Sequence, residues 1–347
     1  MAAPRWSALV QGRSKPDLPA TSENRKYETK GPTVGFTLRV ASAEMGPGDP
    51  RGRSTRICPL CGNRPRLVAP LRSPFSGVTF QLGMCDACQL GLVLDSRTDL
   101  DVLYGPDYYT GKGADPLVDY ERDEQPGSIR EIEWNGIVRT VSAIVRRRQP
   151  VVQSWRLLDW GAGLGGLVRA ARRCGIEADG LDEGYAATVL AEKGLMAMPE
   201  PERRGRYDVI TAIEVVEHLI DPLSVLRSMA ICLKPGGFLF ITTGNLSKAR
   251  GPLDRWYYAQ IPDVHVTFWS PRSWTIALEK AGLEATLLPL RRVDPRIVQY
   301  KVIKALPRFR APLVAALPLW RATARIVDSR YGVSAFPIGV KGLEAAS

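Results

Sequence analysis

Apolar and polar positions alternate between short buried runs and longer helical patterns through the second half of the chain. Residues 155–158 are largely apolar and end at Asp159, which predicts a buried parallel strand. Three glycines follow at alternate positions, and residues 167–173 have helical character. A strand that turns through glycines into a helix brings its backbone close to a ligand, because no Cβ intrudes. The three are Gly161, Gly163 and Gly165.

Residues 176–182 predict the next strand, which ends in Asp182. An acid at the tip of the second strand is where nucleotide-binding α/β folds hold a pair of ribose hydroxyls. Either a dinucleotide site or a nucleoside site fits this pattern. Gly166 also completes a Gly-x-Gly-x-x-Gly spacing, so the glycines alone do not distinguish the two.

Further elements follow from the same periodicities. Isoleucine and valine recur at helical spacing between residues 129 and 145, which predicts an amphipathic helix that packs on the sheet. Asp221 and Ser270 are suitable N-caps for two later helices, and Gly282 is a suitable stop for the second. The remaining helices are expected at residues 185–193, 222–233 and 271–281. The remaining strands are expected at residues 284–290 and 335–340, with a short, poorly marked strand at residues 195–198.

The composition fits one catalytic domain with one small module. The 347 residues are 45% hydrophobic, which supports a sizeable core. The net charge is +11, and residues 287–347 hold eleven Lys or Arg against three Asp or Glu. Such a basic region indicates an anionic partner, namely nucleic acid, an acidic lipid surface or a phosphorylated substrate. A solvated charged face is the commoner explanation.

The hydropathy pattern predicts a cytoplasmic protein. No apolar run reaches the roughly 18 residues that a membrane span needs, and Pro4 and Arg5 interrupt the apolar core of a signal peptide. Residues 297–327 nevertheless have the composition of a segment that lies on an anionic membrane surface, with a lid over the sheet as the alternative. Their apolar set is Val302, Ile303, Leu306, Phe309, Leu313, Val314, Leu317 and Trp320, and their cations are Lys301, Lys304, Arg308, Arg310, Arg321 and Arg325.

The N-terminal part of the chain divides into a tail and a cysteine-containing module. Residues 1–54 are rich in Pro, Gly, Ser and charge, which predicts a disordered basic tail. Residues 55–110 contain two Cys-x-x-Cys pairs and resemble a zinc ribbon, because paired thiolates on tight turns converge on one tetrahedral Zn²⁺. Four thiolates leave no open position, so this zinc is structural; a redox disulfide is the alternative, which a cytoplasmic setting disfavours. The zinc ligands are Cys58, Cys61, Cys85 and Cys88, and the other cysteines, Cys174 and Cys232, are expected on helices in the core.

Three motifs resemble the class I S-adenosylmethionine-dependent methyltransferases, in the family's order. Residues 159–165 carry its acid and Gly-x-Gly-x-Gly loop, residues 207–222 look like its fourth strand and the following turn, and residues 233–243 look like its turn into strand five. The resemblance implies a Rossmann-like, doubly wound α/β domain over residues 128–345, with a basic insertion at residues 291–334. It also implies S-adenosylmethionine as cofactor, held by Asp159, Gly161, Gly163, Gly165, Asp182 and Ile213.

Both histidines of the chain, His218 and His265, follow predicted strands at the edge where ligands bind in open α/β sheets. His265 suits a general base, because an imidazole accepts a proton at neutral pH; a core or capping role is the alternative. Glu214 is expected near the methionine end of the cofactor, with His218 beneath it. The run Glu214, Glu217, His218 is also similar to the metal-binding motif of ubiquinone-pathway O-methyltransferases, and with His265 it resembles small-RNA ribose 2′-O-methyltransferases. On that interpretation a second, divalent metal lowers the pKa of an acceptor hydroxyl.

The order of the parts carries a further resemblance. Two cysteine pairs, a tyrosine-rich segment at residues 103–109 and then a methyltransferase domain are similar to bacterial methyltransferases of sugar and natural-product pathways. This implies methyl transfer to carbon or oxygen of a small molecule, such as a nucleotide-linked or lipid-linked sugar. RNA ribose 2′-O-methylation is one alternative, but no stripe of aromatic and basic residues supports nucleic acid binding. A non-catalytic cofactor-binding protein is another, against which the intact Asp159 and Asp182 argue.

Overall fold

The structure is a computed structural model. The predicted tail at residues 1–54 and most of the predicted membrane-facing segment, residues 306–327, lie outside the residues that it describes. The described residues are 56–96, 104–112, 119–249, 253, 256–305 and 335–342.

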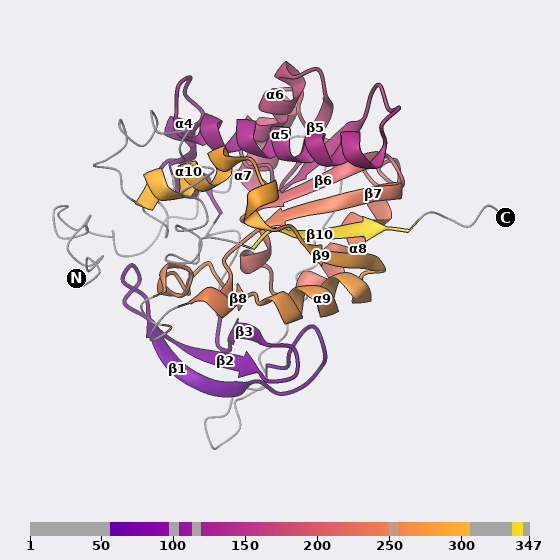
Figure 1. Cartoon of the computed structure of the whole chain (residues 1–347). Helices are drawn as coiled ribbons and strands as arrows, with labels where there is room; N and C mark the ends of the chain where they lie inside the picture. The colour runs from indigo at the N-terminus through magenta and orange to yellow at the C-terminus, as the bar shows by residue number, and fades with distance from the viewer. Residues whose placement is uncertain are drawn as a thin grey trace. The chain divides into compact units, whose positions relative to one another are not determined.

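A six-stranded mixed sheet forms the centre of the larger domain, in the order β5-β4-β6-β7-β10-β9 (Figure 1). The first four strands are parallel to one another, whereas β10 is antiparallel to both of its neighbours. This arrangement confirms the predicted Rossmann-like α/β sheet. The strands are β4 (Arg156–Trp160), β5 (Glu177–Leu181), β6 (Tyr207–Ile213), β7 (Leu233–Thr242), β9 (Leu283–Leu287) and β10 (Pro337–Lys341).

Helices cover both faces of this sheet, because neighbouring residues of its strands point to opposite sides. Leu157 and Phe240 belong to the apolar core under α5, α6 and α10, whereas Leu158 and Leu239 belong to the core under α8 and α9 (Figure 1). The sheet is therefore doubly wound, as predicted. The helices are α5 (Arg130–Arg148), α6 (Gly166–Arg173), α7 (Gly184–Glu192), α8 (Pro222–Cys232), α9 (Pro271–Lys280) and α10 (Pro295–Ala305).

The predicted helix caps are present. The side chain of Asp221 accepts a hydrogen bond from the Ser224 backbone N–H at 3.2 Å at the start of α8. Ser270 accepts from the Ser273 backbone N–H at 3.2 Å, and Ser273 reciprocates in a capping box that starts α9. These side chains satisfy backbone donors that a helix leaves unpaired at its first turn.

The cysteine-containing module has a second, smaller sheet in the order β1-β2-β3-β8. All of its pairings are antiparallel. Its last strand belongs to the segment predicted as methyltransferase domain, so the two predicted domains share a sheet. The strands are β1 (Arg66–Arg72), β2 (Thr79–Cys85), β3 (Leu90–Val93) and β8 (Thr267–Phe268).

Short helical turns lie between these elements. The tyrosine-rich segment forms α3 (Pro106–Tyr109), and α4 (Tyr120–Asp123) precedes the long helix α5. The 3₁₀ turns are η1 (Val216–His218), η2 (Leu246–Lys248), η4 (Tyr257–Gln260) and η5 (Leu290–Arg292).

Two local predictions were wrong. Residues 195–198 form only an isolated parallel bridge between Met196 and Gly180 instead of a strand, with backbone hydrogen bonds from Gly180 to the Leu195 carbonyl and from Ala197 to the Gly180 carbonyl. Cys174 is exposed rather than buried, because α6 ends at Arg173 and leaves it as the C-cap. Cys232 lies in the core as predicted.

Helix α10 corrects the first part of the predicted surface segment. Ile303 is 1% exposed and packs inward, and the side chain of Lys301 is 12% exposed and points into the domain. The helix lies against α5 where Gly136 allows close approach, since a Cβ there would come within 3.0 Å of Ile297. Both residues therefore belong to the interior and not to a lipid-facing set. Within the described part of the chain, no helix is long and apolar enough to cross a membrane.

Candidate functional site

The glycine-rich loop after β4 requires glycine by its backbone conformation. Gly161, Gly163 and Gly165 have φ angles of 73°, 55° and 87°, in the left-handed region that other residues adopt at a cost. A Cβ on Gly161 would lie 2.5 Å from a methyl group of Val215. The loop therefore exposes backbone N–H groups and leads them into the N-terminus of α6, an arrangement suited to a polar ligand.

Two acids flank this loop. Asp159 is buried at the end of β4 and accepts a hydrogen bond from the Thr211 hydroxyl at 2.7 Å. Burial raises the pKa of Asp159 to about 7, although the Thr211 hydrogen bond lowers it. Asp182 follows β5 and accepts from the backbone N–H groups of Gly163 at 2.6 Å and Glu183 at 2.8 Å. Burial raises its pKa to about 6, and these two donors act in the opposite direction.

A cavity beside the loop brings several predicted cofactor residues together. Asp159, Gly161, Gly163, Ile213 and Glu214 all line it. Asp182 does not line the cavity but accepts a hydrogen bond from Gly163, which does, whereas Gly165 lies close to Leu195 and Leu190. The other lining residues are Tyr120, Glu124, Arg130, Trp134, Ala162, Leu164 and Leu167.

Arg130 is a site residue that the sequence analysis missed. Its Nη1 donates to the Tyr300 hydroxyl at 2.9 Å and to Glu133, whereas its buried Nε has no partner in the structure. A buried donor without an acceptor is costly, so this edge of the guanidinium suits an anionic group in the cavity. Helical spacing placed α5 but did not show that Arg130 points to the cavity.

Glu214 is held ionised by its surroundings. It has a φ of 56°, and its carboxylate accepts from Thr242 Oγ1 at 2.9 Å, from the Tyr258 hydroxyl and from Lys301 Nζ at 2.7 Å. Burial by itself raises the pKa of Glu214, but the Lys301 ammonium and these hydrogen bonds outweigh it and lower the pKa to about 2. Lys301 was predicted as a surface cation, and it is the tertiary fold that makes it a partner of Glu214.

Glu217, His218 and His265 form a cluster next to Glu214. One ligand atom from each lies within 4.8 Å of the others, and the two imidazole centroids are 4.9 Å apart. Glu217 is 1% exposed and accepts from the Thr243 hydroxyl at 2.9 Å, while its Oε1 has no hydrogen-bond partner in the structure. Burial, and then the charge of Glu214, raise the pKa of Glu217 well above its ordinary value.

Backbone carbonyls fix the tautomer of both histidines. His218 Nδ1 lies 3.0 Å from the Val264 carbonyl, and His265 Nδ1 lies 2.9 Å from the Tyr258 carbonyl. Because a carbonyl only accepts, each Nδ1 carries a proton, and Nε2 is the basic atom of the neutral ring. The Tyr104 hydroxyl also lies 2.9 Å from His218 Nδ1. The sequence analysis gave Tyr104 no role at the site.

Tyr258 connects the cluster to Glu214, which lines the cavity beside the glycine-rich loop. Its hydroxyl donates to Glu214, its carbonyl accepts from His265, and its ring stacks on the His265 imidazole at 5.3 Å between centroids. A Cβ on Gly244 would lie 2.6 Å from the Tyr258 ring, so a glycine allows this packing. The Tyr258 side chain therefore contacts both Glu214, which lines the cavity, and His265.

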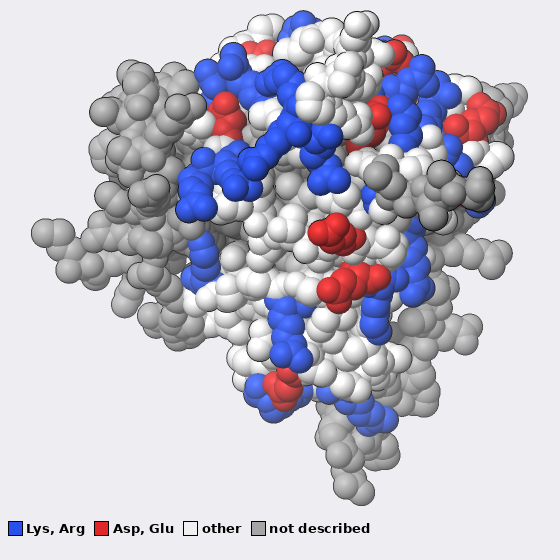
Figure 2. Space-filling model, turned by 45° about the vertical axis from the view of Figure 1, so that its right-hand side comes forward, with Lys and Arg blue, Asp and Glu red and all other residues white. Residues whose placement is uncertain are grey.

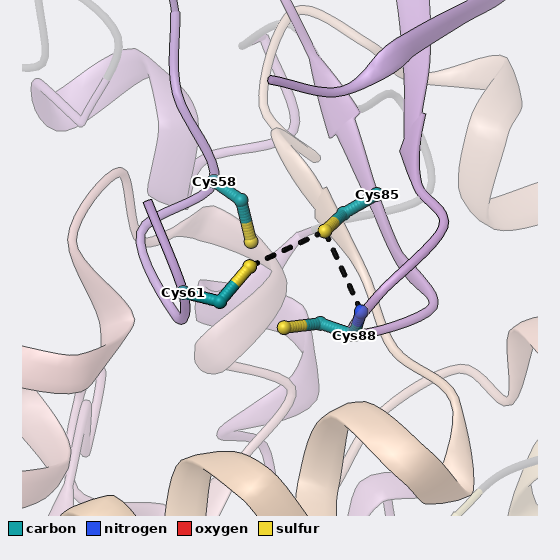
Figure 3. Close-up of side chains that lie close together, drawn as sticks. All are labelled: Cys58, Cys61, Cys85 and Cys88. Atoms are coloured by element: carbon teal, nitrogen blue, oxygen red, sulfur yellow. Dashed lines mark hydrogen bonds between the residues drawn. The ribbon is translucent and has the colours of Figure 1, made fainter. Parts of the chain in front are cut away.

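The four predicted zinc ligands converge at one point (Figure 3). Their sulfur atoms lie within 4.8 Å of one another, with Cys61 Sγ and Cys85 Sγ at 3.5 Å. Burial raises the pKa of Cys58 to about 12, although backbone hydrogen bonds lower it. Four thiolates at this site therefore need a cation to be stable, and four sulfur ligands in this compact arrangement fit Zn²⁺. All four are free cysteines in the structure.

A second hollow lies at the amino ends of β4, β6 and β7 and is rich in cations. Figure 2 shows Lys and Arg side chains gathered on one face of the molecule, with acidic side chains among them. The cations of the hollow are mostly paired with carboxylates, so it offers little uncompensated charge to an anion. The pairs are Arg156 with Glu177 at 2.7 Å, Arg204 with Glu200 at 3.1 Å and Lys234 with Asp208 at 2.8 Å.

Comparison with known proteins agrees with the geometry. Residues 120–288 match a family model described as a methyltransferase domain. The ubiquinone biosynthesis O-methyltransferase of Marinobacter nauticus is 37% identical over 105 residues, which are 26% of this chain and 44% of that protein. Its counterpart from Bordetella avium is 35% identical over 107 residues, or 27% and 44% of the two chains. The chain thus spans less than half the length of these curated relatives.

A solved structure is also similar, at a greater distance. The putative sarcosine dimethylglycine methyltransferase of Galdieria sulphuraria has 22% identity and a TM-score of 0.34, over 59% of this chain and 83% of that one.

The strand order, the glycine loop between two acids and the family match define a nucleoside-cofactor enzyme of the α/β class. Residues 120–288 are a methyltransferase domain of class I, the S-adenosylmethionine-dependent type. The predicted family and fold are thereby confirmed for these residues, and S-adenosylmethionine is supported as the cofactor, whereas the dinucleotide alternative is not supported.

Proposed function

We propose that this protein transfers the methyl group of S-adenosylmethionine to a hydroxyl oxygen of a small molecule. The observation that carries the proposal is the pair of histidines beside Glu217, one of them joined through Tyr258 to a residue of the cofactor cavity. The names of the curated relatives, which are O-methyltransferases, support oxygen as the acceptor atom.

The cavity residues suit the two ends of the cofactor. The methionine part is a zwitterion, and the cavity presents a guanidinium, Arg130, for its carboxylate and a carboxylate, Asp159, for its ammonium group. Asp182, which follows β5, would accept hydrogen bonds from the ribose hydroxyls. The Gly163 backbone lines the same cavity, and its N–H donates to Asp182 at 2.6 Å. Bound there, S-adenosylmethionine supplies an electrophilic methyl group on a sulfonium.

The proposed reaction is a direct displacement. The acceptor oxygen forms a bond to the methyl carbon while the carbon–sulfur bond breaks, and its electron pair goes to sulfur to give S-adenosylhomocysteine. The hydroxyl proton passes to Nε2 of His265, which is the unprotonated nitrogen of the neutral ring. Tyr258 and the backbone of η4 hold His265 in place, so the protein contributes alignment and one proton acceptor.

A divalent cation at Glu217, His218 and His265 is the second candidate means of activating the hydroxyl. The three ligand atoms converge, and the carbonyl-bound Nδ1 atoms leave Nε2 as the ligand atom of each ring. Glu214, the fourth ligand of the predicted set, is paired with Lys301 instead. The test measures activity in a chelator that leaves one zinc per chain by elemental analysis, and again after addition of Mg²⁺, Mn²⁺, Ni²⁺ or Zn²⁺. A pure base mechanism keeps its rate in that chelator.

The acceptor we propose is a nucleotide-linked or lipid-linked sugar, on the basis of the order of cysteine pairs, tyrosines and methyltransferase domain along the chain. The test is transfer of radiolabelled methyl from S-adenosylmethionine to separate pools of nucleotide sugars, lipid-linked sugars, phenols and short RNA. Label in the RNA pool alone favours ribose methylation, and no product in any pool favours a non-catalytic protein. With the labelled acceptor, His265→Gln should lower kcat by at least about 100-fold.

The membrane contact at residues 297–327 stays a proposal for a lipid-linked acceptor. Its support is the sequence composition of residues 306–327, since Lys301 and Ile303 face inward. Flotation of the full chain with anionic liposomes at low salt tests it. Protein that remains at the bottom of the gradient refutes membrane contact and leaves a soluble acceptor.

A further inference from the structure

The four-cysteine module and the segment that carries His265 form one continuous sheet. β3 begins at Leu90, two residues after Cys88, and pairs antiparallel with β8. β8 begins two residues after His265. The paired residues are Gly91 with Phe268 and Leu92 with Thr267. The metal-ligand loop and the proposed base are therefore joined through two adjacent strands.

Backbone hydrogen bonds continue this connection into the catalytic cluster. The Val266 carbonyl accepts from the Val93 N–H at 3.0 Å, and the Val266 N–H donates to the Glu217 carbonyl at 2.7 Å. Two residues earlier, the Val264 carbonyl accepts a hydrogen bond from His218 Nδ1 at 3.0 Å. The stretch around His265 thus lies between the cysteine module on one side and the Glu217–His218 turn on the other.

Helix α9, which follows β8, contacts both cysteine loops. Arg272 Nε donates to the Ala87 carbonyl at 2.8 Å, and Lys280 Nζ donates to the Leu60 carbonyl at 2.7 Å. Leu60 and the buried cysteines belong to the same apolar core as Trp269 and Trp274. The cysteine site is therefore packed into the domain and is not a separate appendage.

The cofactor side of the cavity is held by a different set of contacts. Asp159 is bonded to Thr211, and Asp182 to Gly163 and Glu183. All these partners belong to the large sheet and its loops. The backbone hydrogen bonds described above join the cysteine module to β8 and η1, whereas these cofactor-side hydrogen bonds involve no residue of that module.

We propose that metal binding by Cys58, Cys61, Cys85 and Cys88 positions the acceptor side of the site through β3 and β8. Without the metal, the turn from Cys85 to Cys88 that leads into the short strand β3 is no longer closed, and the His265 segment loses its backbone partner. The cysteines are then positioning residues for His265 and Glu217, and the cofactor side remains assembled. The role of His265 in this inference rests on the function proposed above.

The first experiment compares Cys88→Ser with Cys232→Ser in the full chain. Cys232 is also buried but lies on α8, outside the cluster, so it controls for the loss of a buried thiol. Zinc content is measured by elemental analysis, S-adenosylhomocysteine affinity by calorimetry, and local opening by hydrogen exchange. Cys88→Ser should lose its zinc and exchange at least about tenfold faster at residues 214–219 and 261–270. In the same variant, the hydrogen exchange rates at residues 156–182 and the affinity for S-adenosylhomocysteine should stay within about threefold of the wild-type values.

A second pair of variants keeps the cysteines and separates the strands. A Cβ on Gly91 would lie 3.0 Å from Phe268 Cβ, whereas a Cβ on Gly83 would meet the side chain of Leu94 within the module. Gly91→Val should therefore retain zinc and still show faster hydrogen exchange at residues 261–270. Gly83→Val should not show faster exchange at those residues. If Cys88→Ser fails to fold, this pair of variants still tests whether the β3–β8 contact positions the His265 segment.

The inference is wrong if zinc-free protein keeps wild-type exchange at residues 261–270, or if exchange rises equally at residues 156–182. Once an acceptor is known, the variants should lower kcat and leave the KM for S-adenosylmethionine unchanged. If the wild type methylates no acceptor, the proposed function fails, while the exchange pattern still reports on the link between the cysteines and β8.

Discussion

Replacing Lys301 with methionine should destabilise the protein strongly, because it removes the buried cation that pairs with Glu214, whereas Glu133 keeps its ion pair with Arg130. Lys301 Nζ lies 2.7 Å from Glu214 Oε1 and 3.6 Å from Glu133 Oε1. The three side chains are 12%, 22% and 0% exposed, so water screens them little. Methionine is unbranched and flexible like lysine, so the substitution removes the charge with little loss of packing.

The expected cost is about 3 kcal/mol at neutral pH. Removing one partner of a buried ion pair costs about 3–5 kcal/mol. The pKa of Glu214, lowered from 4.5 to about 2 against the effect of burial, corresponds to about 3 kcal/mol. Because this pKa is depressed in the folded state, its contribution is fully present above the unfolded value of 4.5 and is lost as the pH falls towards about 2. In the variant, burial instead favours protonated Glu214, so the destabilisation should be smaller at pH 4 than at pH 7.5.

Urea unfolding followed by tryptophan fluorescence at pH 7.5 and pH 4 measures this difference. The matched control is Arg66→Met, which breaks an ion pair with Asp86 whose side chains are 62% and 67% exposed. That control should cost less than about 1 kcal/mol, because exposed pairs contribute little. A Lys301→Met protein within about 1 kcal/mol of the wild type at pH 7.5 would refute the buried network, as would a cost that does not change with pH.

Three further outcomes are expected. Asp182→Ala should weaken S-adenosylmethionine binding at least about tenfold in calorimetry, because it removes a charged acceptor for the ribose; unchanged affinity would show that Asp182 is not at the ribose. The dissociation constant should rise as the pH falls from 8 to 5.5, since burial raises the pKa of Asp159 to about 7 and of Asp182 to about 6, and binding favours both carboxylates ionised. In Asp159→Asn the change near pH 7 should disappear, and its persistence there would contradict the assignment. Elemental analysis should find one zinc per wild-type chain and none with Cys58→Ser; zinc retained in that variant would exclude a four-cysteine site.

The strands and helices of the large domain were predictable because their signals are local. Apolar runs, glycines with positive φ and capping residues such as Asp221 and Ser270 depend on a few neighbouring residues. The weak strand at residues 195–198 was predicted wrongly for the same reason, since strand formation needs a partner that the sequence does not show. Cys174 was misplaced because helix ends are uncertain by a residue or two, and one residue moved it from the helix to the exposed cap.

The sequence by itself determined the glycine loop, its two flanking acids and the four cysteines, because backbone conformation and ligand spacing restrict which residues occupy these positions. Only the tertiary structure showed that Lys301 neutralises Glu214, that Arg130 faces the cofactor cavity and that β3 supports the His265 segment. Such contacts join residues that are far apart along the chain. Lys301 and Glu214 are 87 positions apart, and Arg130 and Tyr300 are 170 positions apart. The periodicity of α10 predicts an amphipathic helix, but which side chains meet across the core depends on how α10 packs against α5, and a single sequence carries no direct record of that packing.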